Sequence, residues 1–377
     1  AKSSPSASPS ASASASIVTP PTTTARRATP TPPPVEQSPG FRLPAGEKPV
    51  SYAINFAVDP NQDAFTASET IIVHLDAAQR TVWLHARNLT VTKASVGGHK
   101  ARFTQVDDDG MAALSLDQSV GPGDVNVEIA WSARFNASLE GIYKVVSEGN
   151  AYVFTQFEAI SARNSIPCFD EPGIKTPFLV SFDIPEGMRV AGNTREARSS
   201  EIGNDTVHVE LTKTEPLPVY LLAFAVGPLD IVEGKPVPAS YALHREPIAI
   251  RGVATKGHGA QLAKSMEVSA KCLVALEKWF GIAYPFGKMD IVAVPDFAAG
   301  AMENAGFVTF RDELLFVDDK SPIGLQKANV FVIAHEFAHQ WFGDYVTLAW
   351  WDDIWLNEAF ATWMETPIVE AVRPDFH

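Results

Sequence analysis

From Phe41 to about Asp230, short runs of the chain alternate apolar and polar residues. The stretches VNVEIAW (125–131) and TVHVEL (206–211) are clear examples. Alternation with a period of two is typical of strands that bury one face. Clusters such as DPNQD and VGPGD separate the runs and favour turns. The sequence therefore predicts an N-terminal antiparallel β domain over residues 41–232.

Beyond this domain, the apolar residues change their spacing to a helical period. They predict one amphipathic helix over about 259–281. The short apolar run MDIVAV (289–294) predicts a strand, and residues 326–342 and 353–366 are expected to form two further helices. Residues 233–377 are thus predicted to form a second domain that contains both helices and strands.

Residues 1–40 are a low-complexity segment of Ser, Ala, Thr and Pro without an aromatic residue. Such a segment buries too little apolar surface to offset the entropy of ordering it, so a disordered tether is expected. The sequence begins at Ala1 without an initiator Met. A stalk of this kind favours an extracytoplasmic location (periplasmic, secreted or surface-tethered), although the same composition also occurs in cytoplasmic linkers.

The chain is acidic, with 44 Asp and Glu against 30 Lys and Arg and a formal net charge of −14. This balance argues against nucleic acid as a partner, because non-specific binding needs a basic surface. It is compatible with ligands that carry a free amine. No run of ~20 apolar residues occurs, so no transmembrane helix is expected. The oligomeric state cannot be read from these features.

The stretch HEFAHQW (335–341) contains the main candidate chemistry. His335 and His339 are one helical turn apart, so both imidazoles leave the same face of a helix. Glu336, next to the first histidine, is placed to reach a metal-bound water. The alternative is a helix that happens to carry two ordinary surface histidines.

A catalytic zinc site usually has three protein ligands and an open position for water. Glu358 in WLNEAFATW supplies a third ligand, with 18 residues between it and His339. A solvated helix glutamate is the alternative reading. Several aromatic residues surround Glu358 in the sequence, and a charge amid apolar surface usually has a partner. These residues are Trp350, Trp351, Trp355, Phe360 and Trp363.

Three stretches resemble motifs of one known family. HEFAHQWFGDYVTLAWWDDIWLNEAF (335–360) closely resembles the HExxH-18-E motif of the gluzincin zinc aminopeptidases, which include the aminopeptidase N and leukotriene hydrolase types. GAMEN (300–304) and QFEAISARNSIPCFDEP (156–172) resemble two further motifs. The resemblance covers about 41–377. It implies a multidomain fold, in which an N-terminal antiparallel β-sandwich or saddle domain precedes an incomplete thermolysin-like α/β zinc peptidase domain.

The resemblance implies one zinc ion held by His335, His339 and Glu358. Glu336 would be the general base that takes a proton from the metal-activated water. The substrates would be peptides with a free N-terminal amine. Which N-terminal residue is preferred cannot be read from the sequence.

The same resemblance assigns recognition of the amine and of the substrate main chain. Glu158 and Glu303 would bind the α-amine, with Gln156 beside them, and the GAMEN backbone would bind the main chain. The substrate-binding residues implied in GAMEN are Gly300, Ala301, Met302, Glu303 and Asn304. Leukotriene hydrolase-like members have glutamine in the place of Glu158, so this chain resembles the peptidases more than the epoxide hydrolases.

The sequence departs from the family pattern near its end. The family places an oxyanion-stabilising tyrosine well after the third ligand, and all seven tyrosines here precede Glu358. A fragment, a second chain and loss of activity are each compatible with this difference. Two alternatives to a peptidase therefore stay open, namely an epoxide hydrolase-type member and a non-catalytic peptide-binding protein with a vestigial site.

Overall fold

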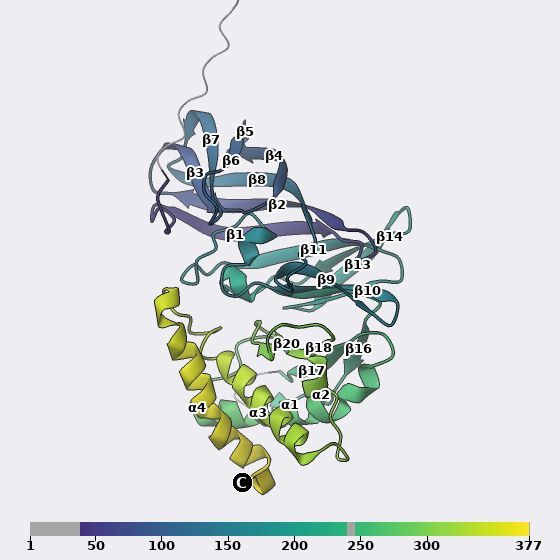
Figure 1. Cartoon of the computed structure of the whole chain (residues 1–377). Helices are drawn as coiled ribbons and strands as arrows, with labels where there is room; N and C mark the ends of the chain where they lie inside the picture. Colours follow the sequence, from purple (N-terminus) through teal and green to yellow (C-terminus); the bar gives the residue numbers. More distant parts are fainter. Residues whose placement is uncertain (1–37, 240–245, 377) are drawn as a thin grey trace, which may run out of the picture. The chain divides into compact units, whose positions relative to one another are not determined.

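The computed structural model describes residues 38–239 and 246–376 (Figure 1). The tether predicted over residues 1–40 therefore lies almost entirely outside the described residues. Within them, sheets form the N-terminal part, and a smaller sheet with four α-helices forms the rest. This architecture confirms the expected fold class. Among the described helices, none combines the length and apolar character needed to cross a lipid bilayer.

The largest sheet has eight strands in the order β13-β14-β11-β1-β2-β8-β4-β5. Its strands are β1 (Glu47–Ala57), β2 (Ala64–Leu75), β4 (Thr90–Val96), β5 (His99–Lys100), β8 (Gly123–Arg134), β11 (Phe178–Pro185), β13 (Glu196–Gly203) and β14 (Thr206–Leu211). All neighbours pair antiparallel except β1 and β11, which run parallel. This parallel pair departs from the predicted all-antiparallel domain, because alternation marks a half-buried strand without specifying its direction.

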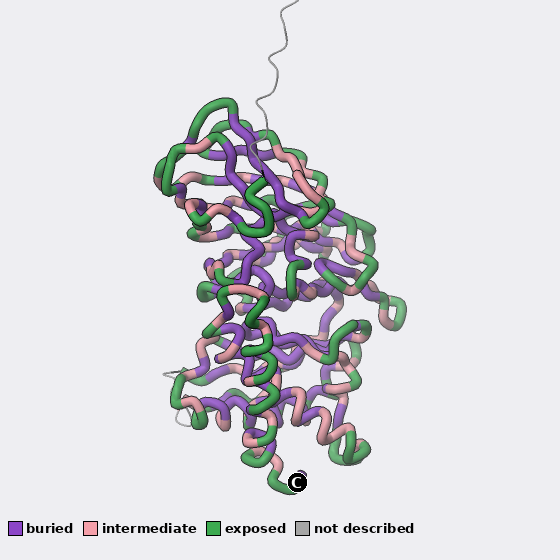
Figure 2. The backbone as a smooth tube through the Cα atoms, turned by 60° about the vertical axis from the view of Figure 1, so that its left-hand side comes forward, coloured by how far each residue is buried: buried purple, intermediate pink, exposed green. Residues whose placement is uncertain are grey.

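Two smaller antiparallel sheets complete the N-terminal part. One has the order β12-β15-β10-β9 and the other the order β3-β7-β6. Their strands are β3 (Gln79–His85), β6 (Arg102–Gln105), β7 (Met111–Val120), β9 (Gly141–Ser147), β10 (Asn150–Gln156), β12 (Arg189–Gly192) and β15 (Phe224–Gly227). Figure 2 shows that buried residues run through the interior of the molecule, whereas exposed residues lie mainly along its outside.

The second part is built on a five-stranded sheet with the order β16-β17-β18-β20-β19. Its strands are β16 (Asp230–Glu233), β17 (Ala249–Ala254), β18 (Lys288–Val294), β19 (Ala301–Met302) and β20 (Phe307–Arg311). The helices are α1 (Ala263–Phe280), α2 (Asp312–Leu315), α3 (Ile323–His339) and α4 (Ile354–Val372). The predicted boundary between residues 232 and 233 falls within β16.

The helix bounds differ from the predicted ones for local reasons. Residues 259–262 form a 3₁₀ turn before α1, and Gly281, at φ +64°, ends that helix in the left-handed conformation that glycine tolerates. Helix α4 continues past Pro367, whereas the prediction ended it at residue 366. Proline lacks an N–H donor. Burial of Ile368 and Val369 in the core of the second part offsets the lost hydrogen bond.

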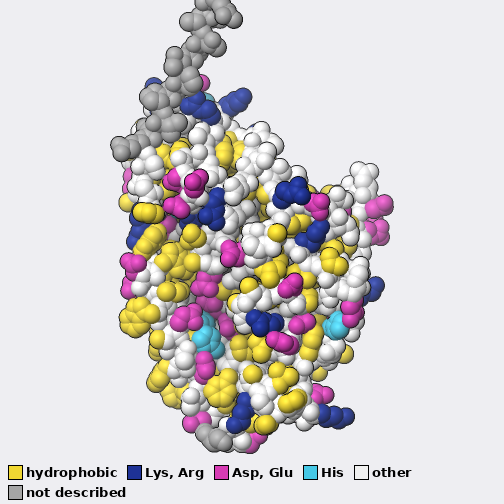
Figure 3. All heavy atoms as spheres, in the orientation of Figure 1, with side chains coloured by type: hydrophobic (Ala, Val, Ile, Leu, Met, Phe, Trp, Pro, Cys, Tyr) yellow, Lys and Arg dark blue, Asp and Glu magenta, His cyan; other side chains and the backbone are white. Residues whose placement is uncertain are grey.

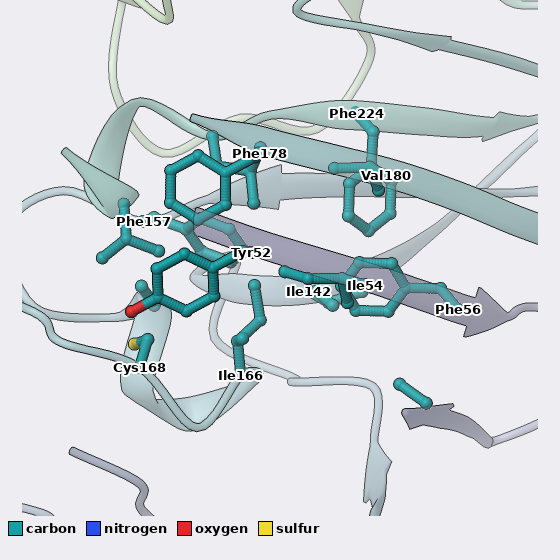
Figure 4. Close-up of a cluster of buried hydrophobic side chains, with 14 of the residues drawn as sticks. Tyr52, Ile54, Phe56, Ile142, Phe157, Ile166, Cys168, Phe178, Val180 and Phe224 are labelled. Atoms are coloured by element: carbon teal, nitrogen blue, oxygen red, sulfur yellow. The ribbon is translucent and has the colours of Figure 1, made fainter. Parts of the chain in front are cut away.

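Two hydrophobic cores lie on opposite faces of the five-stranded sheet. Along β18, Val292 and Val294 belong to the core shared with the N-terminal part, whereas Ile291 and Ala293 belong to the core shared with the helices. Burial on both faces explains why MDIVAV is a continuous apolar run. The N-terminal core is rich in aromatic rings (Figure 4), and Phe56 packs against Phe182, with 5.7 Å between ring centroids.

A buried lysine joins the two parts through polar contacts. The Lys288 Nζ donates to Gly192 O at 2.6 Å, to Gly306 O at 2.7 Å and to Asp290 Oδ2 at 2.8 Å. Arg251 donates to both oxygens of the same Asp290 carboxylate. Burial lowers the pKa of Lys288 to about 8, against the opposing effect of Asp290. The ammonium form therefore prevails at pH 7, and it links β12 to β18 and to the turn before β20.

We expect Lys288→Met to lower the free energy of unfolding by about 3 kcal/mol, because two buried carbonyls lose a charged donor and Asp290 loses one cation. Urea denaturation would measure the change. Lys271→Met removes an exposed lysine that pairs with Glu267 one turn away, and it should cost no more than about 0.5 kcal/mol. Equal midpoints for the two variants would contradict the structural role of Lys288.

Candidate metal centre and active site

Helices α3 and α4 place the three predicted metal ligands around one point. His335 and His339 lie in the last turns of α3, and Glu358 lies in the second turn of α4. The two imidazole Nε2 atoms are 3.1 Å apart. Glu358 places Oε2 at 3.4 Å from His335 Nε2 and Oε1 at 3.8 Å from His339 Nε2. Each residue offers one ligand atom, and these atoms lie within 4.8 Å of one another.

Hydrogen bonds at the far nitrogens orient both rings. His335 Nδ1 is 2.8 Å from Glu365 Oε1, and His339 Nδ1 is 3.1 Å from Phe342 O. Both partners are acceptors, so each Nδ1 carries the proton and each Nε2 presents a lone pair to the cavity. Two facing lone pairs beside a carboxylate form a donor set suited to a cation.

The spacing of this donor set fits zinc. Tetrahedral Zn–N bonds of 2.0–2.1 Å would separate two nitrogen ligands by about 3.3 Å. The 3.1 Å between the Nε2 atoms is close to that value. Two histidines and one glutamate are also a common ligand set of catalytic zinc sites. Calcium and magnesium, in contrast, prefer sets made only of oxygens.

Further carboxylates from other elements face the same cavity, whose volume is about 540 Å³. Glu158 follows the end of β10, Glu303 follows β19, and Glu336 projects from α3. Eight of the predicted site residues line this cavity: Glu158, Gly300, Ala301, Glu303, His335, Glu336, His339 and Glu358. Figure 3 shows acidic side chains gathered around a histidine, with hydrophobic side chains nearby.

Burial, together with neighbouring carboxylates, raises the pKa values of three glutamates in the cavity. Burial, together with Glu303 and Glu358, raises the pKa of Glu158 to about 9. Burial and Glu358 raise the pKa of Glu303 to about 7. Burial and the same neighbouring carboxylates hold the pKa of Glu336 well above its usual range. Each shift means that the empty cavity disfavours the charged form of these three carboxyl groups, whereas the hydrogen bond from His335 lowers the pKa of Glu358. A cation bound among them would favour the charged forms.

Three of the predicted substrate-binding residues do not line the cavity. The Met302 side chain is buried in the N-terminal core. Asn304 is also buried, and its Nδ2 donates to Thr309 Oγ1 at 3.2 Å. Gln156 ends β10, and its Oε1 has no hydrogen-bond partner among the described residues. A substrate-binding role for these three stays a prediction, and the side-chain positions of Met302 and Asn304 do not favour it.

Two residues that the sequence reasoning missed support the site. Glu365 orients His335, as described above. Gln340, which is fully buried, donates from Nε2 to Glu303 O at 2.8 Å and accepts from Gly306 N at 3.0 Å. It therefore ties the end of α3 to the loop that carries Glu303. The sequence offered one signal for Glu365, its position seven residues after Glu358, which places it two turns along the same helix face.

A larger cavity lies elsewhere among the described residues. It has a volume of about 1270 Å³, runs along α1 and α4, and is lined mainly by apolar side chains such as Met266, Val274 and Ile368. It shares no lining residue with the cavity that contains the histidines. Volume alone therefore does not locate the chemistry, which is marked by the convergent imidazoles and carboxylates.

A helix-borne HExxH pair, a glutamate from the next long helix and a preceding multi-sheet domain define the class of gluzincin-type metallopeptidases. Comparison with known proteins agrees with this class. The sequence profile of the Peptidase M1 N-terminal domain matches residues 48–221, and that of the Peptidase family M1 domain matches residues 264–377. The chain belongs to peptidase family M1.

Relatives from distant organisms match over most of the chain. It is 35% identical over 307 residues to a leucyl aminopeptidase of Saccharolobus solfataricus, a match that covers 81% of this chain and 37% of the relative. It is 33% identical over 350 residues to aminopeptidase M1-A of Oryza sativa, and this match covers 89% of this chain and 39% of the relative. It is 31% identical over 341 residues to glutamyl aminopeptidase of Bos taurus, and this match covers 86% of this chain and 35% of the relative. The chain thus spans less than two-fifths of the length of these relatives.

We expect Glu365→Gln to weaken metal binding by about 10- to 100-fold, because a neutral amide orients His335 less firmly and makes it a weaker donor. Competition with a chromophoric zinc chelator would measure the dissociation constant. Glu370→Gln, an equal charge change at an exposed position of α4, is the matched control. Equal zinc affinity in both variants would mean that Glu365 does not act on the ligand.

Proposed function

We propose that this site belongs to a zinc-dependent aminopeptidase that removes N-terminal residues from peptides. One observation carries the proposal. Two Nε2 lone pairs and the Glu358 carboxylate converge on one point, and the buried carboxylates of Glu158 and Glu303 face the same cavity. A hydrolytic metal site beside an anionic pocket suits a substrate whose reacting bond lies close to an ammonium group.

His335, His339 and Glu358 would hold one zinc ion. Zinc bound there would polarise the scissile carbonyl and lower the pKa of water from 15.7 to ~7. Glu365 and the Phe342 carbonyl would keep both rings in the tautomer that leaves Nε2 unprotonated. The residues around the site therefore prepare the ligands before the metal arrives.

Glu336 would act as the general base. Its side chain lines the cavity next to His335 and is only 6% exposed. Its carboxylate would accept the proton of the attacking water and pass it to the leaving amine as the peptide bond breaks. Burial among other carboxylates raises its proton affinity, which suits a group that must both take and return a proton.

Glu158 and Glu303 would bind the α-ammonium of the substrate. An ammonium that enters a partly buried cavity needs anionic partners, because desolvation otherwise opposes binding. Two carboxylates at a fixed distance from the metal ligands also limit cleavage to the first peptide bond. Ala301 lies in β19, an edge strand of its sheet, so its free edge can pair with a substrate main chain. A Cβ at the neighbouring Gly300 would meet no atom within 4 Å, so this approach is open.

We expect the 377-residue chain, loaded with zinc, to cleave amino-acyl anilides with a free amine and to lose that activity with a zinc chelator. N-acetylated anilides should react at least about 100-fold more slowly, because they lack the ammonium that the two carboxylates bind. Initial rates over a panel of substrates would measure both effects. Bound zinc without any cleavage would support the metal site and contradict catalysis by this chain alone, whereas neither zinc nor cleavage would favour the peptide-binding alternative.

Glu336→Gln should lower kcat by about 10²- to 10⁴-fold, because the amide cannot accept the proton of the attacking water. Zinc content, measured by atomic absorption, should stay at one ion per chain, because the ligands are unchanged. Glu313→Gln, at an exposed position of α2, is the matched control and should keep the parent rate. A Glu336→Gln variant with full activity would exclude Glu336 as the base.

A further inference from the structure

A second group of possible metal ligands overlaps the first. Glu158, Glu303 and Glu358 each offer one carboxylate oxygen, and these three oxygens lie within 4.8 Å of one another. They come from three separate elements: the segment after β10, the segment after β19, and α4. Glu358 belongs to both groups. The two candidate sites are therefore neighbours that share one carboxylate.

An acidic cluster alone does not make a site, but Glu303 adds an independent observation. Its side chain is only 4% exposed, and its Oε1 has no hydrogen-bond partner among the described residues. A buried carboxylate oxygen without a donor is costly, so native structures usually give it one. The oxygen lies 3.8 Å from His339 Nδ1, whose proton is directed to the Phe342 carbonyl. Glu303 thus lines the cavity with a buried carboxylate whose hydrogen-bonding capacity the described residues do not fully use.

We propose that Glu158, Glu303 and Glu358 form a second divalent-cation site, of the calcium type, next to the zinc site. The donor set contains only carboxylate oxygens, which hard cations prefer over nitrogen or sulfur ligands. Ca²⁺ takes 6–8 oxygens at 2.3–2.6 Å in flexible geometry, so an oxygen–oxygen spacing of up to 4.8 Å suits it. Mg²⁺ demands a tighter octahedron. Waters in the cavity of about 540 Å³ would complete the shell.

The cation site itself does not depend on the proposed function, but its effect on substrate binding rests on it. Glu158 and Glu303 are also the residues proposed to bind the substrate ammonium, and one position cannot hold both cations. Bound Ca²⁺ would therefore compete with peptides that carry a free amine. A site of three carboxylates completed by water is expected to be weak, with a Kd of about 10⁻⁴–10⁻³ M. Calcium would then regulate the enzyme by occupying its amine pocket.

The test is calorimetric titration of Ca²⁺ into the 377-residue chain that already contains one zinc ion. We expect one Ca²⁺ per chain, with affinity reduced at least tenfold in Glu158→Gln while the zinc content stays unchanged. Glu186→Gln, an exposed glutamate in a turn of the N-terminal part, should leave Ca²⁺ binding as it is. Titration with Mg²⁺ should give at least tenfold weaker binding. Ca²⁺ binding that is equal in all three proteins, or no binding up to about 10 mM, would overturn the second site.

Competition with L-leucinamide, a ligand with a free amine, separates this inference from the proposed function. If both hold, saturating leucinamide abolishes the Ca²⁺ signal, and Ca²⁺ at its Kd raises the KM for amino-acyl anilides about twofold without changing kcat. Ca²⁺ binding that depends on Glu158 but ignores leucinamide would support the cation site and reject the amine pocket. Leucinamide binding without a Glu158-dependent Ca²⁺ site would support the amine pocket and reject the cation site.

Discussion

The site depends on holding like charges together in a partly buried cavity. Glu158, Glu303, Glu336 and Glu358 face the same space, and their mutual repulsion and desolvation oppose the folded state. Only packing elsewhere can hold such an arrangement in place. A cation that enters the cavity relieves this repulsion. The free energy that the repulsion costs in the empty site therefore contributes to the affinity for a cation.

The packing that holds these groups comes from both parts of the chain. The five-stranded sheet is buried between two hydrophobic cores, and Lys288 donates to carbonyls of both parts across that junction. Lys175, from the N-terminal part, donates to the Asp344 and Tyr345 carbonyls in the segment between α3 and α4. Gly173 approaches the same segment so closely that a Cβ would lie 2.9 Å from Ala349 O. The N-terminal domain therefore helps to place Glu358 relative to the histidines.

Single residues connect the two functions of the site. Gln340 joins the end of α3, which carries the proposed metal ligands, to the loop of Glu303, which is proposed to bind the amine. Glu358 faces the histidines with its two oxygens and also contributes to the carboxylate cluster. The proposed metal binding and amine recognition would thus be parts of one polar network.

The sequence by itself determined the features that depend on local geometry. The spacing of His335 and His339 places both rings on one face of any α-helix, and alternation in TVHVEL specified β14 residue by residue. Motif resemblance supplied Glu358 and the carboxylates at 158 and 303. Tertiary structure decided what depends on contacts between distant segments. The parallel pairing of β1 with β11 and the extension of α4 past Pro367 belong here, because burial against other elements outweighed the local preference. The tertiary structure also decided the inward packing of Met302 and the roles of Gln340 and Glu365. A buried amide or carboxylate acquires a function only when folding brings its partner within hydrogen-bond distance.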